Sequence, residues 1–454
     1  MFVAAFGILG LVFGCASAPP TPAAAAAVAA ESPSCVATRA LANGPDSITI
    51  ALPYDVTAAH VPDARNEAER LVFAQLYEGL VRVDCTGAVR AGLARSWNAD
   101  ETRRRWTFVL RDGARFWTGD AVRSADIVAA WRATGQSSAP DAALAARLAD
   151  AATITDERTL VVTLDDSTPN VLAEGILAIY RPRPASSWPE GTGRYGLPEA
   201  TAELLELIPA DPDAGPRVRV RNIRDADARD LLDAGVELLL TNDPRVVSYA
   251  AARADVISLP LSWNRVYVLA MTRDATIRVN PAMREELARD VVRAEAGAPE
   301  PPFWWSDSTG CQRSTVTATM PTATAPRIVY RRDDRVAQQL AERLVAIAGM
   351  SSVAGGARGA RVVATGLAPT DFAAALRAGS DLAYVLDVVR RPASRCDAMT
   401  ALVTTAPWVA TPEGRRGLVP LVETRDRVIV RRERVSLVMD GDGTLRIVGA
   451  SGDR

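Results

Sequence analysis

Apolar residues recur at helical spacing in the segment after residue 67, at Leu71, Val72, Leu76 and Leu80. This spacing predicts an amphipathic helix that buries one face. The segment Val81–Val83 follows directly and predicts a short strand. We therefore expect a helix that packs on a strand here.

The pattern then changes to a two-residue period. Trp106, Phe108 and Leu110 occupy alternate positions, which predicts a strand with one face in a core. Ser124 is expected to cap the helix that follows, because a serine hydroxyl accepts hydrogen bonds from free amide groups of a first helical turn. These elements belong to one N-terminal subdomain.

Two later parts of the chain alternate strands with helices. The expected strands of the first part are Arg217–Arg221, Val236–Leu240 and Val256–Leu259, and those of the second are Arg327–Arg331, Arg361–Thr365 and Leu382–Val388. Such alternation predicts right-handed α/β units. Two units in one chain predict two lobes with a cleft between them, and three short strands after residue 426 are expected to return to the first lobe.

The composition limits the kinds of catalytic and metal site that the chain can form. The chain has 454 residues, 48% of them hydrophobic, and a net charge of −2, so bulk charge gives no reason to expect a nucleic acid partner. The sequence contains no lysine and a single histidine, His60. Schiff-base, Ser/His/Asp and histidine-based metal chemistry are therefore disfavoured. We expect neither an enzyme, nor a cofactor, nor a metal site.

Several motifs stand in a fixed order between Glu67 and Trp131. They read QLYEGLV, LARSW, WTFVLRDGARFWTGD and SADIVAAW. This order resembles the N-terminal signature of the family-5 extracellular solute-binding proteins, the peptide-binding receptors of ABC importers and their relatives. The resemblance implies a two-lobed periplasmic-binding-protein-like α/β fold of type 2, with hinge crossovers between the lobes.

The domain limits follow from these patterns. We expect a signal peptide at 1–15, a tether at 16–45, lobe I at 46–262 with its subdomain at about 54–165, lobe II at 263–411, and a C-terminal return to lobe I at 412–454. The crossovers are expected near Leu261–Trp263 and Thr405–Thr411. Rotation about them would open and close the cleft.

The resemblance also indicates where a ligand would bind. Peptide-binding relatives place an aspartate against the ligand's α-ammonium group, and Asp387 occupies the comparable place beside Tyr384. Alternatively, Asp387 caps its strand or pairs with Arg390 or Arg391. Further candidate ligand contacts are Trp304 and Trp305, for which packing between the lobes is the alternative, and Thr192 and Gly193 in a Gly-Thr-Gly-x-Tyr turn.

The N-terminus resembles an export signal. Met1–Gly14 is apolar and uncharged and ends before Cys15, which resembles a lipoprotein signal peptide whose cysteine is acylated. A plain secretory signal cut near Ala18 is the alternative. The following segment is rich in Ala, Pro, Ser and Thr, so it is expected to be a flexible tether.

Four further cysteines remain: Cys35, Cys85, Cys311 and Cys396. An even number in an exported chain favours two disulfides. Pairing Cys35 with Cys85 and Cys311 with Cys396 keeps each bridge within one lobe, and buried free thiols are the alternative.

These expectations combine into one functional hypothesis. The chain is predicted to be a monomeric, lipid-anchored protein on the periplasmic or outer side of a membrane. It would capture a small solute such as a peptide and deliver it to the membrane subunits of an ABC importer. A sensory or scaffold lipoprotein that has kept the fold and lost the ligand is the alternative hypothesis.

Overall fold

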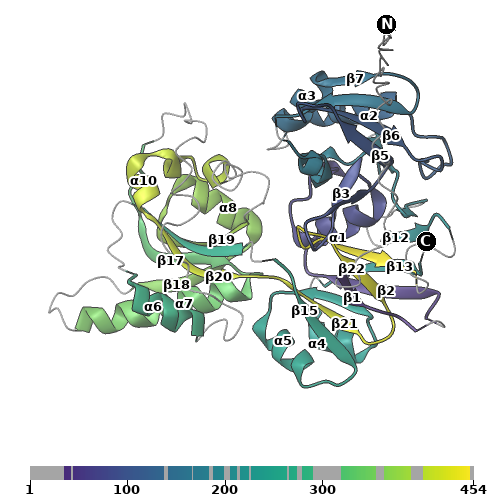
Figure 1. Cartoon of the computed structure of the whole chain (residues 1–454). Coiled ribbons are helices and arrows are strands. Elements are labelled where there is room, and N and C mark those ends of the chain that lie inside the picture. The colour runs from purple at the N-terminus through teal and green to yellow at the C-terminus, as the bar shows by residue number, and fades with distance from the viewer. Residues whose placement is uncertain are drawn as a thin grey trace, which may run out of the picture.

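The structure is a computed structural model. It describes residues 35–41, 44–137, 142–165, 167–183, 188–198, 205–211, 215–223, 226–262, 265–272, 279–289, 319–353, 362–389 and 402–449. Two large sheets form the centres of two lobes, which Figure 1 shows side by side.

A seven-stranded sheet forms the centre of the first lobe. Its strands lie in the order β11 (Tyr195–Gly196), β12 (Leu205–Pro209), β13 (Arg217–Asn222), β2 (Ser47–Leu52), β14 (Leu238–Thr241), β21 (Arg427–Arg431) and β15 (Val256–Pro260). β13, β2 and β14 run parallel, and β21 runs antiparallel to both of its neighbours. The interior strand β14 is apolar except at its last residue and buried throughout, as expected for a parallel strand covered on both faces.

Helices cover both faces of this sheet. α4 (Ala228–Asp233) and α5 (Pro244–Ala251) pack on one face, and α1 (Glu67–Leu76) packs in the core on the other. Asn66 caps α1 by accepting a hydrogen bond from the Glu69 amide at 2.9 Å. The segment Val81–Val83 forms β3, which pairs with β4 (Val89–Ala91). The expected helix and strand are confirmed.

A subdomain extends the first lobe. Its sheet has the order β5 (Ala94–Ala99), β6 (Arg105–Leu110), β8 (Thr159–Thr163) and β7 (Ala152–Ile154), accompanied by α2 (Ser124–Gly135) and α3 (Ala142–Asp150). Phe108 and Leu110 are fully buried, as their alternation predicted. The expected Ser124 cap is wrong: Ser124 is the first residue of α2, and the Asp126 carboxylate accepts from the Arg123 amide. A carboxylate in the first turn, like a capping hydroxyl, accepts hydrogen bonds from unpaired amide groups at the helix start.

The second lobe is built on a five-stranded sheet. Its strands lie in the order β18 (Val363–Leu367), β17 (Ala325–Arg331), β19 (Asp381–Val389), β16 (Arg265–Met271) and β20 (Leu418–Thr424). β17 runs parallel to β18 and β19, whereas β16 runs antiparallel to β19 and β20. α7 (Arg335–Val353) and α6 (Pro281–Leu287) pack on one face, and α8 (Pro369–Ala378) packs on the other.

The chain crosses between the lobes twice. The first crossing separates β15 from β16, at the expected place. The second separates β20 from β21 and contains Asp426, and in Figure 1 β20 leads directly across to the first lobe. This crossing lies later than the expected Thr405–Thr411, because β20 still pairs with β16 over Leu418–Thr424.

The C-terminal strands return to the first lobe. β22 (Ser436–Met439) and β23 (Leu445–Val448) form a hairpin, and β1 (Val36–Thr38) pairs with β22. A disulfide joins Cys35 to Cys85, so this part of the predicted pairing is confirmed. Cys311 and Cys396 lie outside the described residues.

Short elements complete the described parts: β9 (Tyr180–Arg181), β10 (Glu190–Gly191), α10 (Pro412–Arg416), and the 3₁₀ turns η2 (Ala58–His60), η3 (Pro169–Ala173), η4 (Gly175–Leu177) and η9 (Pro407–Ala410). Within the residues that the structure describes, no helix has both the length and the apolar content of a membrane span.

Candidate ligand-binding site

One edge of the second lobe's sheet gathers charged side chains from distant parts of the chain. The carboxyl ends of β17 and β19 lie at this edge because the two strands are parallel. β16 begins there, because its first residue Arg265 pairs with Val389 at the end of β19. β20 ends there, because its last residue Thr424 pairs with Arg265. Ligands of open α/β sheets bind outside the carboxyl ends of the strands. Both connections to the first lobe meet the sheet at this edge.

Arg265 lies at the centre of the edge and is only 4% exposed. Its guanidinium forms ion pairs with Asp387 of β19 and, at 2.9 Å, with Asp426 of the second crossing. The guanidinium carbon also lies 5.5 Å from the ring centre of Tyr54 in the first lobe, and the Tyr54 hydroxyl is 3.5 Å from Asp426. The charges of Asp426 and Asp387 outweigh burial and raise the pKa of Arg265. Arg265 therefore stays charged and contacts both lobes.

Asp334 adds a second acidic group beside α7. Its carboxylate accepts hydrogen bonds from the Tyr267 hydroxyl at 3.1 Å and from the Ala337 amide at 2.9 Å. Burial, and then the charge of Asp387, raise the pKa of Asp334 to about 6. Burial also raises the pKa of Tyr267 well above its usual value, so the tyrosine keeps its proton and remains a donor.

Three carboxylates gather at this edge. The carboxylates of Asp334, Asp387 and Asp426 surround the guanidinium of Arg265, while Arg331 is held by Asp333 at 2.9 Å. Burial is the larger cause of the raised pKa of Asp334, and the charge of Asp387 adds to it. A cationic group of a ligand would be stabilised here. No cluster of His, Cys, Asp and Glu suited to a metal ion occurs in the parts of the chain that the structure describes.

Tyr384 lies apart from this group although it is close to Asp387 in sequence. Neighbouring side chains of a strand alternate between faces, and Tyr384 is completely buried on the α8 side of the sheet. Its hydroxyl donates to the Ala375 carbonyl at 2.7 Å. The structure thus gives Tyr384 a role in packing rather than in the edge around Arg265.

Thr192 and Gly193 lie in the first lobe, next to the end of α1. Thr192 is 3% exposed, and its hydroxyl oxygen accepts from the Glu78 amide at 3.3 Å. A Cβ atom on Gly193 would lie 2.3 Å from the Gln75 carbonyl oxygen, so this turn requires glycine for close packing. Both residues join parts of the first lobe.

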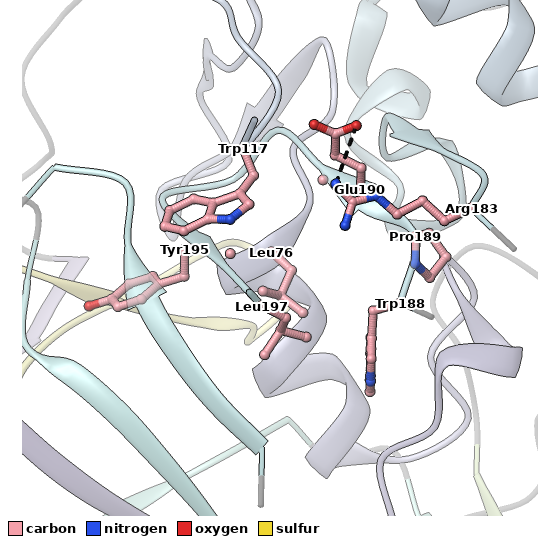
Figure 2. A pocket seen from close by; sticks show the side chains of 10 residues that line it. Leu76, Trp117, Arg183, Trp188, Pro189, Glu190, Tyr195 and Leu197 are labelled. Atoms are coloured by element: carbon pink, nitrogen blue, oxygen red, sulfur yellow. Dashed lines mark ion pairs between the residues drawn. The ribbon is translucent and has the colours of Figure 1, made fainter. Parts of the chain in front are cut away.

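A hollow lies beside this turn and encloses about 270 Å³, part of it open to solvent. Figure 2 shows Glu190 and Arg183 together at one end, and the hydroxyl of Tyr195 pointing away from the hollow. Trp117 and Trp188 also line it. All of its lining residues belong to the first lobe, so the hollow is separate from the edge around Arg265.

The remaining expected site residues, Trp304, Trp305 and Cys15, lie outside the described residues. Sequence reasoning missed Arg265, Asp334 and Asp426 altogether. A signal was present for Arg265, since a lone charge opens the apolar run RVYVLAM. Asp426 gave no signal because it stands among alternating charges in ETRDR.

Comparison with known proteins finds part of the chain similar to one family of binding proteins. Residues 88–202 match the model of the bacterial extracellular solute-binding proteins, family 5. The periplasmic oligopeptide-binding protein OppA of Haemophilus influenzae is 44% identical over 64 residues, which are 14% of this chain and 12% of that protein. The nickel-binding periplasmic protein of Escherichia coli is 35% identical over 79 residues, 17% and 15% of the two chains.

Over residues 88–202 the chain is similar to the family-5 extracellular solute-binding proteins.

The sequence matches of this chain are short, since they span 12% and 15% of these two relatives' lengths. Solved structures extend the likeness in fold. A dipeptide-binding protein from Pseudoalteromonas sp. SM9913, in complex with Met-Leu, superposes with a TM-score of 0.63 at 12% identity, covering 88% of this chain and 98% of that one. The pheromone receptor PrgZ gives 0.60 at 13% identity, covering 89% and 99%. The predicted two-lobed type 2 fold is confirmed.

Proposed function

We propose that this protein captures a small solute between its two lobes and delivers it to the membrane subunits of an ABC importer. The observation that carries the proposal is the charged edge around Arg265, which joins both inter-lobe connections and Tyr54 of the first lobe. Hinge closure over such an edge would exclude water and strengthen charged contacts to a solute. The mechanism is binding without covalent chemistry.

The proposed ligand carries a cationic group, and a peptide with a free amino terminus fits this requirement. The carboxylates of Asp334, Asp387 and Asp426 near Arg265 support it. Asp387 is the proposed contact because its side chain is 25% exposed, whereas that of Asp426 is fully buried. The relatives described as binding oligopeptides and Met-Leu support the same class of ligand.

Calorimetry against a library of peptides and metabolites tests this proposal. Asp387→Asn should weaken the binding of a cationic solute about thirtyfold or more, since losing a buried charged contact costs roughly 2–5 kcal/mol. The variant should fold normally because asparagine keeps an oxygen that accepts from Arg265. Asp227→Asn is the matched control: it also removes a carboxylate paired with an arginine, Arg229, far from the edge. Equal affinity in Asp387→Asn and wild type would contradict the assigned contact.

Export and anchoring form a second part of the proposal. A lipid on Cys15 would hold the protein at a membrane surface, and the tether after it would let the lobes reach the importer. The mature protein should then partition into detergent, and Cys15→Ser should abolish this behaviour. A Cys15→Ser protein that stays fully membrane-bound would contradict the lipid anchor, whereas a soluble wild-type protein would favour a plain secretory signal.

One observation favours the scaffold alternative: Asp387 already has a partner in Arg265. In a protein that no longer binds solute, such a pair would only stabilise the fold. Absence of heat with every library compound, together with X-ray scattering that shows no compaction, would make this alternative the better account.

A further inference from the structure

Arg265 makes two different ion pairs at the point where the connections between the lobes meet the sheet. One end of its guanidinium, Nη1, donates to Oδ2 of Asp387, and the other, Nη2, donates to Oδ2 of Asp426 at 2.9 Å. A planar guanidinium can hold two carboxylates at once, which a lysine ammonium does less well. Arg265 is therefore shared between a carboxylate of the sheet and a carboxylate of the second crossing.

The surroundings hold this guanidinium in place. β16 lies between β19 and β20, with Arg265 opposite Val389 on one side and Thr424 on the other. The side chain of Asp426 is completely buried and that of Arg265 is 4% exposed. Moving Arg265 into water would leave a buried carboxylate without its counter-ion, which is strongly unfavourable. The pair Arg265–Asp426 is thus the fixed part of the group.

Asp387 is in a different situation. Its side chain is 25% exposed, so a solute can approach it, yet one of its oxygens already accepts from Arg265. An ammonium group that arrives at the exposed side meets a carboxylate whose charge is partly neutralised. The ammonium must then share Asp387 with Arg265, or displace Arg265 toward Asp426.

We propose that Arg265 is a specificity-determining residue that acts as a resident competitor for Asp387. By occupying this carboxylate it lowers the affinity for any solute whose main contact is an ammonium group. Simple amines are excluded, and solutes that combine an ammonium with further contacts, such as peptides, are retained. The inference rests on the proposed function, because it assigns the ammonium contact to Asp387.

A charge-balanced double variant, Arg265→Gln with Asp426→Asn, tests the inference. It removes one positive and one negative charge, so Asp387 becomes free without a change in the net charge of the edge. Binding of the same peptide library to wild type and variant is measured by calorimetry. The dissociation constant of the peptide that binds most tightly is then compared with that of its N-acetylated form. The matched control is Arg229→Gln with Asp227→Asn, which removes an exposed pair of the first lobe.

The measured quantity is the dissociation constant of the acetylated peptide divided by that of the free peptide. In the double variant this ratio should rise at least tenfold, which equals about 1.4 kcal/mol, and adding Asp387→Asn should abolish the rise. The control pair should leave the ratio unchanged. A merely structural role of Arg265 would change both dissociation constants together and leave their ratio constant.

The outcomes separate this inference from the proposed function. Binding with an unchanged ratio in the double variant overturns the role of Arg265 and leaves solute capture standing. Absence of binding by wild type and variant alike overturns both. If the double variant does not fold, Arg265→Lys takes its place, because lysine keeps the positive charge but lacks the planar guanidinium that donates to two carboxylates. Its ratio should still rise by about threefold, because a lysine ammonium holds two carboxylates less firmly, and an unchanged ratio overturns the inference.

Discussion

Replacing Asp334 by asparagine should remove a pH dependence of stability that this carboxylate imposes on the second lobe. Asp334 directly precedes α7, where it accepts hydrogen bonds from the Ala337 amide and the Tyr267 hydroxyl. Asparagine retains an oxygen for these contacts and is as good a residue at a helix start as aspartate. The substitution therefore removes the charge and keeps the local structure.

The sign of the effect follows from the raised pKa. Burial and the charge of Asp387 raise the pKa of Asp334 from 3.8 to about 6. The folded protein thus holds this proton more tightly than the unfolded chain does, so its contribution to stability is present below pH 3.8 and is lost as the pH rises to about 6. At about 1.4 kcal/mol per pH unit, the loss is roughly 3 kcal/mol at most, and partial exposure of Asp334 reduces it.

Urea unfolding between about pH 4 and pH 7 measures this effect, with hydrogen exchange in β16 and β17 as a probe of the second lobe alone. The free energy of unfolding of wild type, minus that of Asp334→Asn, should fall as the pH rises through this range. Asp333→Asn is the control, since the salt bridge to Arg331 lowers the pKa of Asp333 despite its partial burial. A difference that stays flat or rises for Asp334→Asn would refute the reasoning.

Two further predictions concern the first lobe. Cys35→Ala should lower the free energy of unfolding by roughly 4 kcal/mol on the chain-entropy estimate, because the disulfide to Cys85 spans 50 residues; urea denaturation with and without reductant checks this, and equal stability would contradict it. Gly193→Ala should cost about 1–3 kcal/mol through overpacking against the Gln75 carbonyl, whereas the control Gly113→Ala, whose Cβ would contact nothing within 4 Å, should be nearly neutral. Equal losses of melting temperature in both variants would contradict the packing role of Gly193.

The sequence by itself determined the local elements and indicated similarity to one family. Periodicity located the strand Arg105–Leu110 and the start of the helix Glu67–Leu76, although Leu80, which fits the helical pattern, lies beyond the end of the helix. A two- or 3.6-residue period reports directly which side chains are buried. The even number of cysteines predicted disulfides, and the expectation that each bridge stays within one lobe favoured the bridge between Cys35 and Cys85. The motif order between residues 67 and 131 indicated the family whose model matches residues 88–202.

The limits of the second lobe depended on tertiary structure. The sequence placed the return to the first lobe near Thr405–Thr411, whereas Leu418–Thr424 forms β20 of the second lobe's sheet. This apolar segment would suit an edge strand of either sheet. Only its pairing with β16 decides to which lobe it belongs, and pairing between distant segments leaves no trace in a local pattern.

The candidate site was also decided by tertiary structure. The sequence indicated Asp387, but its partner Arg265 is 122 positions away, and Asp426, the second partner of Arg265, comes from a connection between strands. Strand register brings these charges to one edge. Burial there, together with the charge of Asp387, raises the pKa of Asp334. Register and burial are properties of the assembled sheet, so no local stretch of sequence contains them.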